Sequence, residues 1–153
     1  MSTTMAIVLA AGKGSRFDSD LPKVLHPVHQ KPMVHHVIDT ILESHINTIC
    51  LVVGNQKDMV KSACNNYQLM YATQEKQLGT GHALQCAIPE IKRVMPTQCI
   101  VLAGDCPLIQ SNTISTLIDI HQSTNASATL LTAKLPDAGA YGRIIRNQNT
   151  KKI

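Results

Sequence analysis

The stretch LAAGKGSRFDSDLPKV, residues 9–24, combines residue types that bind phosphate. Gly12 and Gly14 carry no Cβ, so the backbone N–H groups beside them can come close to a phosphate or a base. Arg16 offers a planar fork of donors for phosphate oxygens, and Lys23 offers a point charge farther along the chain. Two cations on one loop suit a polyphosphate. The alternative is a surface loop whose charges are solvated.

The spacing within this stretch does not fit two common phosphate-binding motifs. A dinucleotide fingerprint needs a third glycine where Phe17 stands, and a helix that begins at once. A P-loop needs four residues between its first glycine and a Gly-Lys-Ser/Thr sequence, but here Lys13 follows the first glycine directly. A long loop after the first strand still lies where open α/β sheets bind their ligands.

Two further segments carry groups that suit a nucleotide and a metal ion. The apolar run VLAGD ends in Asp105, and a carboxylate at the carboxyl end of a buried strand faces a ligand more often than the core. The segment QLGTGHA places Gly79, Thr80 and His82 before a helical pattern. Structural roles account for the same residues, because Asp105 can start a turn, Thr80 can cap a helix and His82 can pack within it.

Apolar runs that alternate with helical patterns predict the fold that positions these groups. Runs that are rich in β-branched residues or end in glycine predict strands at 5–10, 47–54, 68–73 and 98–104. Helical patterns occur at 33–45, 57–66, 81–88 and 111–123. The alternation predicts an α/β fold, a Rossmann-like open and mostly parallel sheet with helices on both faces. Further strands are expected at 126–135 and 141–147, and the domain is expected to be incomplete at its C-terminus.

Composition and charge restrict the class of protein. The fourteen Lys and Arg residues give a net charge of +4 and are scattered, and three Tyr, one Phe and no Trp leave few rings on which bases could stack. No nucleic acid is therefore expected as a partner. No apolar run reaches the ~18 residues of a membrane helix, so no membrane partner is expected either. Five cysteines without CxxC spacing favour reduced thiols, which predicts a cytoplasmic protein, and the histidines show no metal-ligand spacing.

The motifs together resemble one enzyme family. GKGSR followed by LPKVLHP, with QLGTGHA, LAGDCPLI and AYGRI farther along, is similar to the sugar-phosphate nucleotidylyltransferases, and in particular to the uridylyltransferase domain of the bifunctional GlmU family. The resemblance covers essentially the whole chain and implies the nucleotide-diphospho-sugar transferase fold. Two positions depart from the family pattern: Ala103 stands where the family has an aromatic residue, and Gln30 stands where a glycine is common.

The resemblance implies roles for individual residues. Arg16 and Lys23 correspond to catalytic, phosphate-binding cations, which offset the charge of the two anions that the reaction brings together. Asp105 corresponds to the ligand of Mg²⁺, a hard cation that prefers oxygen. The other nucleotide- and substrate-binding positions are Leu9, Ala10, Ala11 and Gly12 on the loop, Gln74, Gly79 and Thr80 at the uracil, Ala103 and Gly104 beside Asp105, and Gly142 near the sugar.

The implied reaction is the transfer of a uridylyl group from UTP to N-acetylglucosamine 1-phosphate. It gives UDP-N-acetylglucosamine, a precursor of cell wall and lipopolysaccharide, and pyrophosphate, with Mg²⁺ as the cofactor. Residues 1–153 would form a partial nucleotidylyltransferase domain without the family's acetyltransferase β-helix, because the family's sugar contacts and a second metal ligand lie beyond residue 153. Three hypotheses stay open: an active uridylyltransferase, a nucleotide-binding piece with little turnover, and a non-catalytic interaction module. A homo-oligomer is compatible with each of them.

Overall fold

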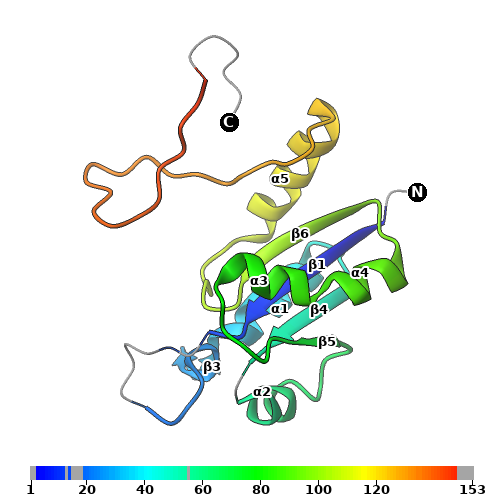
Figure 1. The fold of residues 1–153 in the computed structure, drawn as a ribbon, viewed down its shortest axis with the longest axis vertical. Helices are drawn as coiled ribbons and strands as arrows, with labels where there is room; N and C mark the ends of the chain where they lie inside the picture. The colour runs from blue at the N-terminus through cyan, green and yellow to red at the C-terminus, as the bar shows by residue number, and fades with distance from the viewer. Residues whose placement is uncertain (1–2, 13, 15–18, 55, 148–153) are drawn as a thin grey trace. The chain divides into compact units, whose positions relative to one another are not determined.

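A parallel sheet of four strands forms the centre of the first of two units, Met1–Thr116 (Figure 1). The structure is a computed structural model of the chain that describes residues 3–12, 14, 19–54 and 56–147. The strands lie in the order β5-β4-β1-β6, and every neighbouring pair is parallel. The first four predicted strands are confirmed, with small shifts at their ends, as β1 (Thr4–Ala10), β4 (Thr48–Val53), β5 (Met70–Thr73) and β6 (Gln98–Ala103).

The strand order reverses beside β1. After β1 the chain adds β4 and then β5 on one side, and it returns to add β6 on the other side. In an open α/β sheet, the carboxyl ends of the strands at such a reversal leave a crevice in which ligands bind. We therefore expect a ligand site at the loops that follow β1 and β6.

Helices cover both faces of the sheet, with α1 behind it and α3 and α4 in front of it in the view of Figure 1. The predicted helices are confirmed as α1 (Met33–Glu43), α2 (Lys57–Ala63), α3 (Thr80–Cys86) and α5 (Ser111–Thr124). Two elements were not expected from the sequence, the short 3-10 helix η1 (Lys23–Leu25) and α4 (Ile88–Val94). Helix α4 has Pro89 in its first turn, where proline is tolerated because the N–H group has no partner within the helix.

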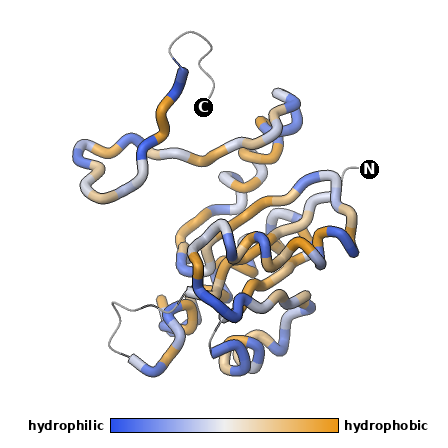
Figure 2. The backbone as a smooth tube through the Cα atoms, viewed as in Figure 1, coloured by the Kyte–Doolittle hydropathy of each residue, from blue (hydrophilic) through white to orange (hydrophobic). Residues whose placement is uncertain are grey.

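The core lies on both faces of β1 and β4, and Figure 2 shows hydrophobic residues running along these strands. Met5 and Ile7 of β1 are fully buried in a cluster that includes Ala83 and Ala87 on the α3 side. The intervening residues of β1 and the apolar stripe of α1 are buried as well: Ala6, Val8, Val34, Val37, Ile38 and Ile41. Burial on both faces explains why these strands are continuous apolar runs in the sequence.

Strand β6 lies at the edge of the sheet formed by the described residues, and only one of its faces is buried. Ile100 and Leu102 are buried, whereas Val101 between them is 41% exposed. The expectation of strands buried on both faces therefore holds for β1 and β4 but not for β6.

A hairpin precedes α1 and was not expected from the sequence. Its strands β2 (Pro27–Val28) and β3 (Lys31–Pro32) are antiparallel. His29 and Gln30 connect them with φ angles of 48° and 63°, in the left-handed region that favours glycine. Gln30 thus adopts a conformation that favours glycine, at a cost of about 1 kcal/mol.

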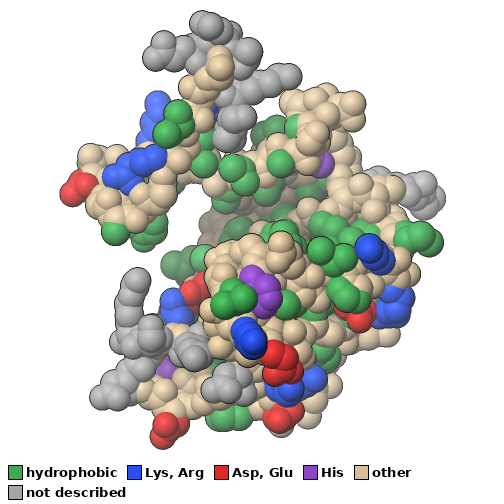
Figure 3. Space-filling view, in the orientation of Figure 1, with side chains coloured by type: hydrophobic (Ala, Val, Ile, Leu, Met, Phe, Trp, Pro, Cys, Tyr) green, Lys and Arg blue, Asp and Glu red, His purple; other side chains and the backbone are tan. Residues whose placement is uncertain are grey.

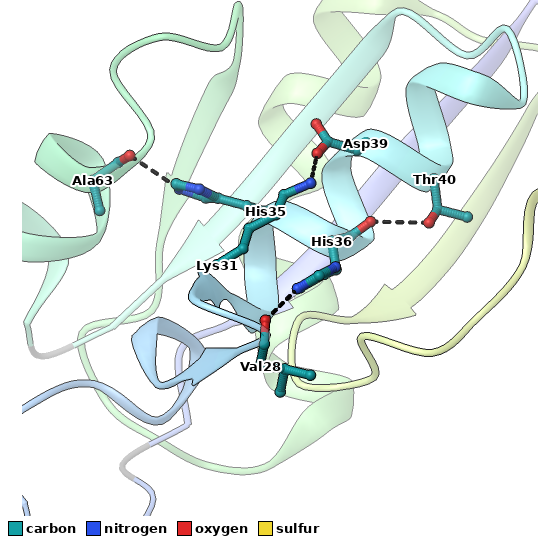
Figure 4. A network of polar contacts seen from close by, with 7 residues as sticks. All are labelled: Val28, Lys31, His35, His36, Asp39, Thr40 and Ala63. Carbon is teal, nitrogen blue, oxygen red and sulfur yellow. Dashed lines mark hydrogen bonds and ion pairs between the residues drawn. The ribbon is translucent and has the colours of Figure 1, made fainter.

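Polar contacts attach α1 to this hairpin and to α2 (Figure 4). Lys31 forms an ion pair with Asp39, and Nε2 of His36 lies 2.8 Å from a carbonyl oxygen of β2. Nε2 of His35 lies 3.0 Å from the carbonyl oxygen of Ala63. Burial lowers the pKa of His35, although the Ala63 carbonyl acts in the opposite direction. Both histidines therefore have packing roles, and they point to different elements as neighbours on a helix do.

Residues 125–147 contain no strand, which corrects the strands predicted at 126–135 and 141–147. Leu131, Tyr141 and Ile145 are 61%, 74% and 81% exposed. A strand exists only where a neighbouring backbone pairs with its N–H and C=O groups, and within the described chain no neighbour pairs with this segment. These residues belong to a second unit, Leu117–Ile153, which is separate from the unit Met1–Thr116.

Charged side chains, cysteines and helix lengths describe the surface and composition of the chain. Figure 3 shows Lys and Arg side chains scattered over the visible face among polar and acidic groups. All five cysteines are unpaired. In the part of the chain that the structure describes, no helix has both the length and the apolar character that a membrane crossing requires.

Candidate active site

The carboxyl ends of β1 and β6 bring two of the predicted site segments together. Leu9 lies opposite Ala103 in the strand register, and the N–H of Gly104 donates to the carbonyl oxygen of Leu9 at 2.9 Å. A Cβ on Gly104 would lie only 3.1 Å from that oxygen, so a side chain there is crowded. As a result, the loops that begin at Ala11 and Asp105 leave the same edge of the sheet side by side.

Lys23 and Asp105 meet at this edge. Buried Val24 and Leu25 anchor the short helix η1, which begins with Lys23. The Nζ atom of Lys23 lies 2.6 Å from Oδ2 of Asp105, although 82 residues separate them in the sequence. The two side chains are 36% and 31% exposed, so solvent and ligands can reach both. A cation that suits phosphate and a carboxylate that suits a metal ion therefore share one location.

A cavity of about 270 Å³ lies between the ends of β1 and β4. Three residues predicted to hold the nucleotide, Ala10, Ala11 and Gly12, line it. The opposite walls come from the segments 19–22 and 54–60, which Gln56 joins by donating from Nε2 to the carbonyl oxygen of Asp20 at 2.6 Å. Apart from its chain neighbours, none of the described residues has an atom within 4 Å of the position of a Cβ on Gly12, so these residues leave its backbone open to a ligand.

Gly54 is a residue of this cavity that sequence reasoning missed. A Cβ at Gly54 would lie 2.5 Å from the carbonyl oxygen of Ala11 and 3.0 Å from Nε2 of Gln77. Such a distance to a backbone oxygen is too short for any side chain, so glycine is required where the chain leaves β4. The one signal in the sequence is a glycine at the end of an apolar run, which is common at strand ends and does not reveal the neighbour across the sheet.

Gln74 is the buried polar residue of the site, with 3% of its surface exposed. Its backbone N–H donates to the carbonyl oxygen of Val53 at 2.8 Å, which fixes it beside the end of β4. Its Nε2 lies 3.1 Å from the carbonyl oxygen of Gly79 and 3.0 Å from Nδ1 of His82. Two residues predicted at the uracil, Gln74 and Gly79, are thus in contact, and His82 joins them without having been predicted.

Gly79 also shows why the helix α3 starts where it does. It is the N-cap of α3 with φ 98°, a left-handed conformation that glycine adopts without strain. Thr80 is the first residue of the helix, so the alternative that Thr80 caps it is wrong.

A comparison with protein families identifies the chain. The MobA-like NTP transferase domain matches residues 6–138. The chain belongs to this NTP transferase family. Its parallel sheet, with helices on both faces, agrees with that assignment.

Curated relatives of this NTP transferase domain include bifunctional GlmU proteins. The chain is 47% identical to that of Brevibacillus brevis over 148 residues, and 48% identical to that of Clostridium novyi over 150 residues. Each match covers 97% of the chain but only 32% and 33% of the relative. The resemblance to the GlmU family is therefore confirmed, and the chain spans about a third of the length of these relatives.

Solved structures with low sequence identity share the fold of the domain. A nucleotidyl transferase from Methanothermobacter thermautotroptrophicus has a TM-score of 0.67 at 17% identity, with 76% of this chain and 57% of that chain covered. A UDP-glucose pyrophosphorylase from Acinetobacter baumanii has a TM-score of 0.61 at 21% identity, with 81% and 54% covered. The predicted α/β nucleotidyltransferase fold is confirmed.

The roles assigned to the site residues of the NTP transferase domain remain predictions, and three of these residues also lack a described place in the site of the first unit. Arg16 lies outside the described residues. Gly142 belongs to the second unit, which is described by itself. Ala103 is exposed at the end of β6, where the family's aromatic side chain would otherwise stand.

The described residues contain no group of three or more His, Cys, Asp and Glu side chains that could enclose a metal ion. This is compatible with Mg²⁺, which usually takes one or two carboxylates and completes its shell with water and substrate phosphates. Asp105 fits that role because it is a partly exposed carboxylate beside a cation. Burial and the charge of Asp105 raise the pKa of the neighbouring Cys106 thiol.

Proposed function

We propose that this domain transfers a uridylyl group from UTP to N-acetylglucosamine 1-phosphate. The observation that carries the proposal is the contact of 2.6 Å between Lys23 and Asp105 at the carboxyl edge of β1 and β6. Phosphoryl-type transfer depends mainly on placement and on charge stabilisation, and this edge offers both signs of charge within reach of one ligand. The family match and the GlmU relatives support the choice of reaction.

In the proposed reaction, a phosphate oxygen of the sugar phosphate attacks the α-phosphorus of UTP. The bond from that phosphorus to the bridging oxygen breaks, and pyrophosphate leaves with the electron pair. The exposed backbone around Gly12 would hold the nucleotide phosphates, and Lys23 would neutralise charge as the two anions approach. Asp105 would hold Mg²⁺, which supplies Lewis-acid stabilisation of the phosphate oxygens.

The ion pair between Lys23 and Asp105 has a consequence for binding. A phosphate that draws Lys23 toward it, or a metal ion that draws Asp105, competes with their mutual contact. Since both side chains are about one-third exposed, the contact costs at most about 1 kcal/mol to break. We therefore expect UTP and Mg²⁺ to bind more tightly together than either binds alone.

A second candidate function is nucleotide binding without turnover. The exposure of β6 favours it, because Val101 is 41% exposed and, among the described residues of the first unit, β6 pairs with β1 on one side and with no strand on the other. The nucleotide half of the site is then present, while the contacts to the sugar phosphate are not among the described residues of the first unit. On this view the chain binds UTP and makes little UDP-N-acetylglucosamine.

Two measurements test the proposal. Calorimetric titration with UTP, with and without Mg²⁺, measures binding by the purified chain, and a coupled assay with N-acetylglucosamine 1-phosphate measures the release of pyrophosphate. Sugar-dependent release supports the transferase, and UTP binding without release supports the second candidate. A folded chain that binds no UTP contradicts both.

A further inference from the structure

The side-chain amide of Gln74 has a defined direction. Gln74 is nearly fully buried, and its Nε2 contacts the carbonyl oxygen of Gly79 at 3.1 Å. A carbonyl oxygen only accepts hydrogen bonds, so the amide in this structure presents its NH₂ group to Gly79. The reverse orientation would place two oxygens at this distance inside a buried site.

His82 completes the environment of this amide. Its Nδ1 lies 3.0 Å from the same Nε2. An amide NH₂ group has two N–H donors, and the Gly79 carbonyl and the Nδ1 lone pair accept one each. His82 is then neutral, with its proton on Nε2.

The amide oxygen is left for a ligand. Both hydrogen bonds of the Gln74 side chain start at Nε2, and Oε1 makes none to the residues that the structure describes. The segment that follows Gln74 borders the cavity, because Nε2 of Gln77 lies 3.0 Å from the position of a Cβ on Gly54, and Gly54 lines that cavity. Gln74 itself pairs through its backbone N–H with the carbonyl oxygen of Val53, so it lies next to Gly54 at the edge of the sheet where the cavity opens.

We infer that His82 is a positioning residue that holds Gln74 with its oxygen toward the base, and that it thereby selects uracil over cytosine. The inference rests on the proposed function and deepens it. Uracil carries a hydrogen on N3 that Oε1 can accept, whereas N3 of cytosine is itself an acceptor and faces the oxygen with its lone pair. Sites that hydrogen-bond a particular N–H discriminate well, because the wrong ligand leaves a buried group unpaired.

The test compares UTP and CTP binding to the wild-type chain and to variants at His82. Leucine removes the acceptor but keeps an apolar side chain of similar size, so His82→Leu leaves one N–H of a buried amide unpaired. We expect the ratio of UTP to CTP affinity to fall by at least about fivefold in this variant. His121→Leu is the control, since His121 contacts Thr129 in the second unit, and its ratio should equal that of the wild type.

Two polar substitutions at His82 keep the test informative if the leucine variant does not fold. His82→Asn keeps an oxygen about as far from the backbone as Nδ1, whereas His82→Gln moves it one bond farther. We expect the asparagine variant to retain the preference for UTP and the glutamine variant to lose it.

The possible outcomes distinguish a failure of the inference about His82 from a failure of the proposed function. If the wild-type chain binds UTP and all three His82 variants keep its UTP preference, the inference about His82 is wrong and the proposed function stands. Equal losses for UTP and CTP at an unchanged melting temperature would show that His82 only supports the fold, and would overturn the inference as well. A wild-type chain that binds no UTP overturns the proposed function and this inference with it.

Discussion

Replacing Asp105 by asparagine tests whether this carboxylate serves a ligand or the fold. The change removes the negative charge and keeps the shape of the side chain. It breaks the ion pair with Lys23, in which the two side chains are 36% and 31% exposed. Ion pairs with this much exposure stabilise a protein by less than about 1 kcal/mol. For a chain of this size, the melting temperature should therefore fall by no more than about 4 °C.

The effect on ligand binding should be larger. If Asp105 holds Mg²⁺, its neutralisation removes a charge-assisted contact of roughly 1.5 to 3 kcal/mol. This energy corresponds to a loss of about 10- to 150-fold in the Mg²⁺-dependent affinity for UTP. The two predicted effects therefore differ in size and can be separated by measurement.

The chain offers a matched control. Asp39 pairs with Lys31, and the Lys and Asp side chains of that pair are 38% and 32% exposed, which is close to the exposure of the Lys23–Asp105 pair. Asp39→Asn should therefore have a stability cost of similar size and no effect on Mg²⁺ dependence. Calorimetry with UTP at several Mg²⁺ concentrations, together with thermal unfolding, measures both quantities. An unchanged Mg²⁺ dependence in Asp105→Asn, or equal changes in the two variants, would show that Asp105 is only a turn residue.

Three further predictions concern binding, packing and pH. Lys23→Ala should weaken UTP binding by about tenfold or more and uridine binding much less, because Lys23 is assigned to phosphate; equal losses in parallel titrations would mean that it only supports the loop. Gly54→Ala should lower the free energy of unfolding by about 1 to 3 kcal/mol in urea denaturation, since the new Cβ would lie 2.5 Å from the Ala11 carbonyl oxygen; an unchanged midpoint would show that the loop can shift. The free energy of unfolding should also fall as the pH drops below about 6.5, because burial holds the pKa of His35 below its value of 6.5 in the unfolded chain, so the unfolded state takes up the proton first. His35→Asn should flatten that part of the pH profile, and an unaltered profile would assign it to other groups.

The sequence predicted the elements of the first unit because their patterns are local. Strands β1 and β4 are buried on both faces, so they appear as continuous runs of aliphatic residues. Helix α1 shows its apolar stripe at helical spacing, with Val34, Val37, Ile38 and Ile41 buried. The position of the motifs around Gly12 and Asp105 at strand ends could also be predicted, because each motif directly follows an apolar run.

Local sequence patterns gave wrong or missing predictions where an element depends on contacts with residues that are distant in the chain. The residues 126–135 have the composition of a strand but no neighbour to pair with in the described chain. The hairpin of β2 and β3 forms although Gln30 occupies a left-handed position that usually carries glycine. Helix α4 follows α3 almost directly, and no described side chain caps its N-terminus, so the sequence carries no capping signal for its start.

The amino-acid sequence by itself determined the α/β class, the four strands of the parallel sheet, the helices α1, α2, α3 and α5, and the family to which the chain belongs. Only the tertiary structure decided which groups meet. It placed Lys23 against Asp105 across 82 residues, and it turned the amide of Gln74 toward Gly79 and His82. The physical reason is that side-chain periodicity reflects burial along one element, whereas contacts between side chains depend on the register and twist of strands that are far apart in the chain.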